Sequence, residues 1–525
     1  MRKKNAKPTP TPKKKIVSSP ARSNVMEVGY PFFMQDAHQK QYSQYLNKYL
    51  SQERMFQGTK AIRWTPAINP NPSLLYTDST DLGLIAINTV AGASYYGHQN
   101  VLMPLDDLFP NYQHQFLDVG WRKGVVGKNL FSVPQHVSIR LLFYRKDLLY
   151  KYFFKPPQTW DELEKQASTI LSGEKNPVLN GFVFNFNPDV SFSMFLDYIW
   201  AQGVDLYENR PQWILNRQAL ETGLNQIKRF FTAGITPKAV LNYQYSDSFK
   251  SFLEGRSVFL HHWSDGLRLI SDLPKEQQEN FGWCLLPTQN IKVQSKSLIG
   301  GVNYAIPKNT NYPEAARTIL KKIMEDDFQC WFAENLAAPF PGLKSVYLNR
   351  TVRQTRPYLD QAEFLLRHGK LLEECAYLHG DYLNWRSIGG QELSFLIEGN
   401  DSIQEVADRM EKRFAFLLPN PTYSGLAAQT IDYIQNHIEE PLKVTAIAQH
   451  LKVSPEHLIR LFKQQTQQTP LEYINETKME RAKILLKKSH LSIGEIAYRL
   501  GYKSRHHFSR LFHELVKNTP SKYRG

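Results

Sequence analysis

Two stretches near the end of the 525-residue chain carry hydrogen-bond donors and cations at the spacing of one helical face. In each stretch, apolar residues at helical intervals form a stripe that requires burial, and the opposite face is polar. Arginine, histidine, serine and glutamate side chains on an exposed helix can bond to base edges and phosphates. The two polar faces comprise Glu456, His457, Ile459, Arg460 and Lys463 in the first stretch, and Arg505, His506, Ser509, Arg510 and His513 in the second.

The same helical unit contains both polar faces and occurs twice. In each copy a short apolar helix is followed by a tight turn, at residues 451–453 and 500–502, where Gly501 can adopt a positive φ without strain. Ser454 and Ser504 stand at the N-cap positions of the polar helices. A helix, a short turn and a polar helix form the helix-turn-helix arrangement, whose second helix lies in the major groove of DNA. The matching residues are Ile447, Ala448, Leu451, His457, Leu458, Arg460, Leu461, Phe462, Thr469, Pro470 and Tyr473 in the first copy, and Ile496, Ala497, Leu500, His507, Phe508, Arg510, Leu511, Phe512, Thr519, Pro520 and Tyr523 in the second.

Positive charge is concentrated at the two ends of the chain. Residues 426–525 contain 16 Lys and Arg against nine Asp and Glu, and residues 1–24 contain eight basic residues and no acidic one. Residues 25–425 carry 40 basic and 40 acidic residues, so they are neutral overall. A basic surface neutralises phosphates and releases counterions. The charge and the repeat together favour a DNA-binding module over the alternative, two ordinary helical hairpins.

The second copy contains the C-terminal motif of a known family, formed by Ile496, Ala497, Gly501, Tyr502, Ser504, Phe508, Arg510, Phe512, Thr519, Pro520, Tyr523 and Arg524. On this basis residues 426–525 resemble the AraC/XylS-type bacterial transcription regulators. The resemblance implies seven helices, with a long helix at residues 471–488 joining two helix-turn-helix units. It also implies that bases or phosphates are contacted by Glu456, His457, Ile459, Arg460, Arg505, His506, Ser509 and Arg510. Gln467 and Lys517 stand where the family usually has glycine, and His513 replaces a usual lysine.

Length and composition predict a globular protein of several domains. The 525 residues are 42% hydrophobic, which is enough for large cores. Cys284, Cys330 and Cys375 are far apart and odd in number, which argues against a disulfide framework and favours a reducing compartment. Residues 1–24 are expected to be a disordered basic tail, since their few apolar residues cannot form a core. We find no apolar run that fits a secretory signal or a membrane span.

Residues 25–425 alternate predicted strands and helices, which indicates an α/β fold. Strands are expected at 25–30, 60–64 and 82–87, the last one buried and parallel, and helices at 37–51, 160–171, 192–202, 217–233, 312–325 and 402–417. The sequence has no nucleotide-binding glycine loop or nucleophile elbow. His261 and His262 are adjacent and would point apart on a strand, so they do not form a metal-binding pair. We therefore expect no catalytic residue, metal or cofactor.

Several motifs in this region resemble the solute-binding proteins of bacterial ABC sugar importers. They are Pro104-Leu105-Asp106-Asp107, Phe131-Ser132-Val133-Pro134, Leu142-Phe143-Tyr144-Arg145-Lys146-Asp147-Leu148, Pro157-x-Thr159-Trp160-Asp161-Glu162-Leu163, Phe249-x-x-Phe252-Leu253-x-Gly255-Arg256, Gly300-Gly301-Val302-Asn303-Tyr304-Ala305-Ile306-Pro307 and Pro313-Glu314-Ala315-Ala316. The resemblance covers residues 25–418. It implies a periplasmic-binding-protein-like fold, in which two α/β lobes joined by a hinge close on a ligand.

The same resemblance assigns ligand-facing positions to Trp263, Tyr198, Trp200, Gly301 and Asn303. Sugar sites stack aromatic rings on apolar sugar faces while polar groups bond the hydroxyls. For Tyr198 and Trp200 the alternative is core packing in an amphipathic helix. The loop after Pro134 reads Gln135-His136-Val137-Ser138, without the aromatic and acidic residues of maltose-type relatives, and Val302 replaces a common aromatic. These departures indicate a smaller or different sugar, or a site that has been lost.

Together these features predict a cytoplasmic transcription regulator with an α/β two-lobe sensor domain and an all-α DNA-binding domain. Its segments are a tail at 1–24, the sensor at 25–418, a linker at 419–425 and the DNA-binding domain at 426–525. The expected partners are promoter DNA and a small solute, with a carbohydrate favoured; RNA polymerase and a second copy of the chain are further candidates. Two alternatives stay open: a solute-binding component of a sugar transporter with an appended helical module, and a DNA-binding regulator whose sensor is a degenerate, protein-contacting scaffold.

Overall fold

Strands β6 (Val133–Arg145) and β12 (Ser297–Ala305) form the centre of the N-terminal domain. They pair antiparallel, from Val133 opposite Tyr304 to Ile139 opposite Ile299. Nearly all of their side chains are buried. Because consecutive residues such as Leu141, Leu142 and Phe143 are buried on both faces of the strand, helices must cover both sides of the sheet.

The computed structural model describes most of the chain. The described residues are 25–30, 36–50, 61–66, 75, 79–88, 96–97, 100–188, 190–208, 214–336, 339–370, 382–399, 401–415, 426–438, 440–466, 468–488 and 491–524. The predicted basic tail at 1–24, the predicted linker at 419–425, Cys375 and Gln467 lie outside these ranges. Among the described helices, none combines the length and the apolar character needed to cross a membrane.

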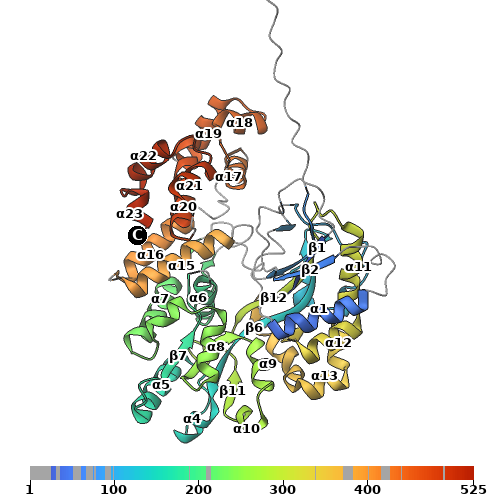
Figure 1. Cartoon of the computed structure of the whole chain (residues 1–525). Coiled ribbons are helices and arrows are strands. Elements are labelled where there is room, and N and C mark those ends of the chain that lie inside the picture. The colour runs from blue at the N-terminus through green and yellow to red at the C-terminus, as the bar shows by residue number, and fades with distance from the viewer. Residues whose placement is uncertain are drawn as a thin grey trace, which may run out of the picture.

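A single sheet runs through both lobes of the domain, in the order β2-β1-β3-β12-β6-β10-β7 (Figure 1). Strand β6 changes partners along its length, because its residues up to Ile139 pair with β12 and those from Arg140 onward pair with β10. The first lobe is therefore built on β1, β2 and β3, and the second on β7, β10 and β11. The strands are β1 (Val25–Tyr30), β2 (Ala61–Pro66), β3 (Leu82–Asn88), β7 (Asn180–Phe184), β10 (Ser257–Trp263), β11 (Phe281–Cys284), β13 (Phe340–Pro341) and β14 (Gly369–Lys370), with small separate pairs β4 (Val125–Val126) with β5 (Asn129–Leu130) and β8 (Tyr207–Glu208) with β9 (Ile214–Leu215).

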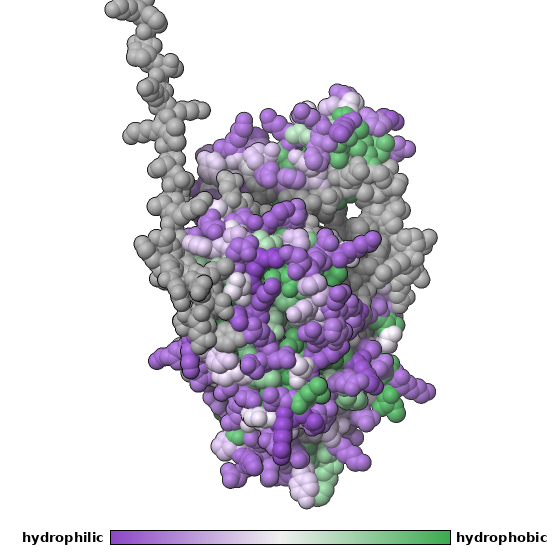
Figure 2. Space-filling view, turned by 90° about the vertical axis from the view of Figure 1, so that its right-hand side faces the viewer, coloured by the Kyte–Doolittle hydropathy of each residue, from purple (hydrophilic) through white to green (hydrophobic). Residues whose placement is uncertain are grey.

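Helices surround the sheet in both lobes (Figure 1). The first lobe contains α1 (Asp36–Leu50), α3 (Asp118–Arg122), α11 (Pro313–Ile323), α12 (Asp326–Asn335), α13 (Arg350–Thr355) and α14 (Ala362–Leu366). The second contains α4 (Lys146–Lys151), α5 (Trp160–Glu174), α6 (Ser191–Trp200), α7 (Arg217–Thr232), α8 (Tyr245–Leu253), α9 (Asp265–Ser271), α10 (Lys275–Gln278), α15 (Tyr382–Glu398) and α16 (Ile403–Ala415). Every strand and helix predicted between 25 and 417 is present, with ends that move by a few residues. On the face in Figure 2, hydrophilic residues predominate and hydrophobic residues are scattered.

The prediction of a loop after Pro134 is wrong. Gln135, His136, Val137 and Ser138 lie in β6 and are buried. Their backbone pairs with β12 on one side and with β13 on the other. The polar side chains made this stretch look like a loop, whereas pairing with strands more than 150 residues away decides its conformation.

Helix α16, the last helix that the structure describes before the DNA-binding domain, is held on the second lobe. Arg217, in the first turn of α7, forms ion pairs with Asp408 and Glu411 of α16, at 2.7 and 3.0 Å. The buried carboxylate of Glu392 on α15 binds Arg409 and Arg413 of α16, both at 2.7 Å. Helices α15 and α16 are therefore attached to the second lobe.

The C-terminal domain contains the seven predicted helices among its described residues. They are α17 (Leu426–Asn436), α18 (Val444–His450), α19 (Pro455–Thr466), α20 (Pro470–Lys488), α21 (Ile493–Arg499), α22 (Arg505–Val516) and α23 (Pro520–Arg524). Helix α20 is the long connecting helix, and it contributes to two separate apolar cores. Tyr473 and Ile474 pack into the first unit, and Met479 and Ala482 into the second.

A core tryptophan tests the packing of the second lobe. Trp160 at the start of α5 is buried, with its ring centroid 4.8 Å from that of Tyr198. We expect Trp160→Ala to lower the free energy of unfolding by about 3–5 kcal/mol, because it deletes a large buried side chain. Urea unfolding of the full chain followed by circular dichroism measures this. Tyr150→Ala is the control, since that ring is exposed; equal losses in the two variants would contradict the packing.

Candidate DNA-binding surface and solute site

The second helix-turn-helix unit presents its polar face on α22. Ser504 caps this helix, with its Oγ accepting from the backbone N–H of His507 at 3.2 Å. Gly501 has φ of +73° in the turn, as its position predicts. Phe508 and Phe512 are buried against α20 and α21. The opposite face leaves the predicted DNA-contacting residues Arg505, His506 and Arg510 exposed and Ser509 half-buried.

The first unit repeats this geometry on α19. Ser454 accepts a hydrogen bond from the backbone N–H of His457 at 3.2 Å. Lys452 has φ of +56°, so a lysine occupies the left-handed position that Gly501 takes in the second unit. Ile459 is 38% exposed, and Arg460 donates to Nδ1 of His457 at 3.3 Å. The predicted residues Glu456, His457, Ile459, Arg460 and Lys463 are all exposed on one face.

The departures from the family pattern have local structural consequences. Lys517 ends α22 in the left-handed conformation, with φ of +58°, which is the conformation that a glycine at this position adopts more easily. His513 is exposed in the last turn of α22. The backbone after α22 therefore follows the path that the family's usual glycine would take, and Lys517 adopts this conformation with some backbone strain.

Trp263 lies where β10 meets β6 and β12. Its half-buried ring stacks over the guanidinium group of Arg140, whose carbon is 4.3 Å from the ring centroid. A Cβ atom on Gly300 would lie 2.6 Å from this ring, so glycine is required there for the tryptophan to rest against β12.

Gly301 and Asn303 follow Gly300 on β12. Gly301 has φ of +130°, and a Cβ there would lie 2.2 Å from the carbonyl oxygen of His136. Asn303 is buried, and its Nδ2 donates to Oγ of Ser132 at 2.9 Å. Trp263 thus lies against Gly300, the neighbour of Gly301, whereas Asn303 bonds to Ser132 further along the strand.

Tyr198 and Trp200 lie on α6, each only 2% exposed. The ring of Tyr198 packs on Trp160 and Phe230 in the core of the second lobe. Trp200 donates from Nε1 to Asp205 at 2.9 Å. These positions fit the core-packing alternative, and a ligand contact by either residue stays a prediction.

A buried ion pair beside Trp263 was not predicted from the sequence. Arg140 on β6 donates to Asp197 on α6 at 2.8 Å, and neither side chain is exposed to more than a trace of solvent. The other carboxylate oxygen of Asp197 accepts from the backbone N–H of Leu298 at 3.0 Å, and Nε2 of His261 lies 3.3 Å from the first. Burial lowers the pKa of His261, although Asp197 opposes this shift. These contacts join β6, α6, β10 and β12. The four residues are too widely spaced in the sequence to be recognised as a motif.

Asp265 is a second candidate that the sequence analysis did not select. It opens α9 two residues after Trp263, and its side chain is 8% exposed. Burial raises the pKa of Asp265 to about 7, with Arg268 acting in the opposite direction. The sequence His262-Trp263-Ser264-Asp265 could have indicated this residue, since an acid close to an aromatic residue suits the binding of a hydroxylated ligand.

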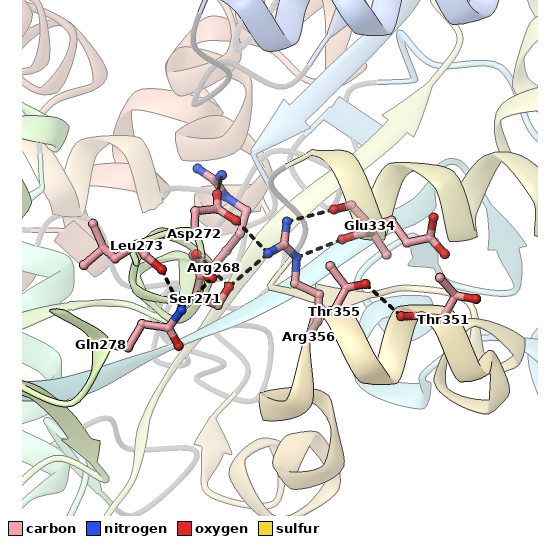
Figure 3. Close-up of polar contacts among 10 residues, drawn as sticks. Arg268, Ser271, Asp272, Leu273, Gln278, Glu334, Thr351, Thr355 and Arg356 are labelled. Carbon is pink, nitrogen blue, oxygen red and sulfur yellow. Dashed lines mark hydrogen bonds and ion pairs between the residues drawn. The ribbon is translucent and has the colours of Figure 1, made fainter. Parts of the chain in front are cut away.

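The two lobes also touch through Arg356, which follows α13 (Figure 3). This guanidinium group donates to the carbonyl oxygen of Glu334 at 2.8 Å within the first lobe. Across the junction it donates to Asp272 at 2.6 Å and to Oγ of Ser271 at 3.0 Å, at the end of α9. Arg268 binds the other oxygen of Asp272. One carboxylate therefore holds an arginine from each lobe.

Comparison with known protein families identifies both domains. A model of the helix-turn-helix domain matches residues 447–525, and a model of the bacterial extracellular solute-binding protein matches residues 80–329. Regulatory protein SoxS of Escherichia coli (strain K12) is 36% identical over 103 residues, which are 20% of this chain and 96% of SoxS. The chain belongs to the AraC family of helix-turn-helix transcription regulators.

The chain covers a smaller share of the length of other curated relatives, and the solved structures share only the fold. The chain spans 29–34% of the length of three further curated helix-turn-helix regulators. Histidine kinase P4 of Formosa agariphila is 37% identical over 163 residues, which are 31% of this chain and 10% of that protein. Maltose-bound MalE3 of T. maritima superposes with a TM-score of 0.64 at 19% identity, covering 75% of this chain and 100% of that chain. This likeness confirms the predicted two-lobe fold.

The contact between the lobes can be tested at Arg356. We expect Arg356→Met to lower the free energy of unfolding by about 1–3 kcal/mol, because it leaves buried hydrogen-bond acceptors unpaired. Arg353→Met is the matched control, since Arg353 pairs with Asp360 on the surface and exposed pairs contribute about 1 kcal/mol or less. Urea unfolding of the full chain compares the two variants. A smaller loss of unfolding free energy for Arg356→Met than for the control would contradict the role of Arg356 in joining the lobes.

Proposed function

We propose that the protein is a cytoplasmic transcription regulator that binds promoter DNA through α19 and α22 and is controlled by a small solute, with a carbohydrate favoured, bound between the lobes of its sensor domain. The observation that carries the proposal is the union, in one chain, of a two-lobe solute-binding fold and two helix-turn-helix units with exposed polar faces. The protein would act by binding and would catalyse no reaction.

Recognition of DNA would use the exposed residues of the two polar faces. Arg505 and Arg510 can donate two parallel bonds to guanine, and Glu456 can accept from cytosine. Lys463 suits a phosphate, which gives affinity and salt dependence without sequence preference. The two units would then read two successive segments of the major groove.

Binding of a sugar would involve Trp263, together with Gly301 and Asn303 on β12. The half-buried indole ring offers an apolar face, and Asp265 offers a carboxylate at the start of α9. This pairing of an aromatic ring with a polar acceptor suits the apolar face and the hydroxyls of a carbohydrate. MalE3 is described as maltose bound, which supports the same ligand class for this chain.

Control of DNA binding would follow from closure of the lobes. The ion pairs of Arg217 and Glu392 hold α16 on the second lobe, so the DNA-binding domain follows that lobe along the chain. A ligand that binds the closed arrangement more tightly would shift the population toward it. The closed first lobe would then change how the DNA-binding domain is presented, or how it meets RNA polymerase or a second copy of the chain.

A ligand screen tests the sensor. We expect one sugar in a panel of mono- and oligosaccharides to raise the melting temperature of the full chain by a few degrees, because a ligand stabilises the state it binds. Trp263→Ala should abolish this shift. Trp331→Ala is the control, since that ring stacks on Tyr45 in the first lobe, and it should keep the shift. No shift with any sugar would instead favour a degenerate sensor that contacts a protein.

DNA binding can be tested independently of the ligand. Duplexes enriched by the full chain from a random library serve as probes in fluorescence anisotropy at fixed salt. We expect Arg510→Ala to weaken binding by about 1–3 kcal/mol, because a contact to a base edge is lost. Arg367→Ala removes the same charge from an exposed site on the sensor and should leave the affinity unchanged. Equal affinities of the two variants would exclude Arg510 as a base contact.

A further inference from the structure

Lys478 is a buried cation at the junction of the two helix-turn-helix units. It lies in the middle of α20 and is 4% exposed. Its Nζ donates to the carbonyl oxygen of Glu440 at 2.7 Å and to that of Leu500 at 2.6 Å. Glu440 belongs to the segment between α17 and α18 of the first unit, and Leu500 ends α21 of the second. One ammonium group therefore holds a backbone acceptor from each unit.

A second contact at the same place is independent of the lysine. Gly501 has φ of +73°, and a Cβ there would lie 2.5 Å from the carbonyl oxygen of Glu440 and 2.7 Å from the nitrogen of Pro441. The turn of the second unit therefore rests directly on the backbone of the first. Only glycine permits both this conformation and this approach.

Burying an ammonium group is costly, so the contact needs a reason. Burial lowers the pKa of Lys478 to about 8, with the carboxylate of Glu440 acting in the opposite direction, and the group is still largely charged at neutral pH. Its Nζ also lies 5.4 Å from the ring centroid of Tyr502, which packs in the second core. An apolar side chain would fill the same space, but it would not fix the position of two carbonyl groups.

We propose that Lys478 is a positioning residue that fixes the separation and rotation of the recognition helices α19 and α22, and thereby the spacing between the two DNA segments that they read. The proposal rests on the proposed function. Both recognition helices pack on α20 through their own units, so the angle between the units decides where each helix meets the groove. Each added base pair moves a site along the duplex and rotates it by about 34–36°. If the junction between the two units is rigid, the protein would therefore bind DNA with only one spacing between the segments. If the junction is loose, it would bind DNA with several spacings.

The test uses the full chain and a duplex that the wild type enriches from a random 30-base-pair library, about three helical turns long. One base pair is then inserted between the two segments that the protein protects. We expect the insertion to weaken wild-type binding by about tenfold or more, comparable to the loss of one good base contact. Lys478→Met, which keeps the apolar stem, should lose threefold or less on the same insertion, and Lys478→Arg should restore the wild-type discrimination.

A folded Lys478→Met protein that discriminates between the two duplexes as the wild type does would overturn the proposal. Its melting temperature establishes whether it is folded. If that variant does not fold, Gly501→Ala is used instead, because it disturbs the same contact with Glu440 from the second unit. A Gly501→Ala protein that loses as much affinity on the insertion as the wild type would likewise overturn the proposal. Failure of the wild type to enrich or bind any duplex would overturn the proposed function itself, which distinguishes the two failures.

Discussion

The sensor domain depends on the pairing of β6 with β12, because β6 exchanges this partner for β10 between Ile139 and Arg140. The same strand therefore belongs to both lobes. At the exchange point Arg140 and Asp197 form a buried ion pair, in which either charge alone would be strongly destabilising. Trp263 stacks on Arg140 of this pair, so the aromatic ring among the proposed sugar contacts is positioned by the junction of the lobes.

Both domains have a buried cation at the junction between their two halves. The DNA-binding domain has two units with separate cores, whereas the two lobes of the sensor share one continuous core; in each domain a buried cation lies where the halves meet. Arg140 binds a carboxylate and aligns strands, whereas Lys478 binds two backbone carbonyl groups and aligns helices. Buried polar contacts of this kind are directional, which apolar contacts are not. They specify one orientation of the halves in addition to any stability that they contribute.

The route from the sensor to the DNA-binding domain passes through the second lobe. Ion pairs hold α16 on α7 and α15, while Arg356 joins the first lobe to the end of α9. Movement of the first lobe would break or remake the Arg356 contact without disturbing α16. In the proposed function, the DNA-binding domain would follow the second lobe, and movement of the first lobe would supply the change that a ligand controls.

The sequence by itself determined the helices, the repeated unit and the exposed polar faces, because the period of an amphipathic helix and its capping residues are local properties. Arg510 could be placed on the exposed face because Phe508 and Phe512 must be buried. Local patterns could not predict three other features: the strand at Gln135, the burial of Tyr198 and the hydrogen bonds of Lys478 to both units. Each depends on partners brought together from distant parts of the chain, and only the tertiary structure decides which of them meet.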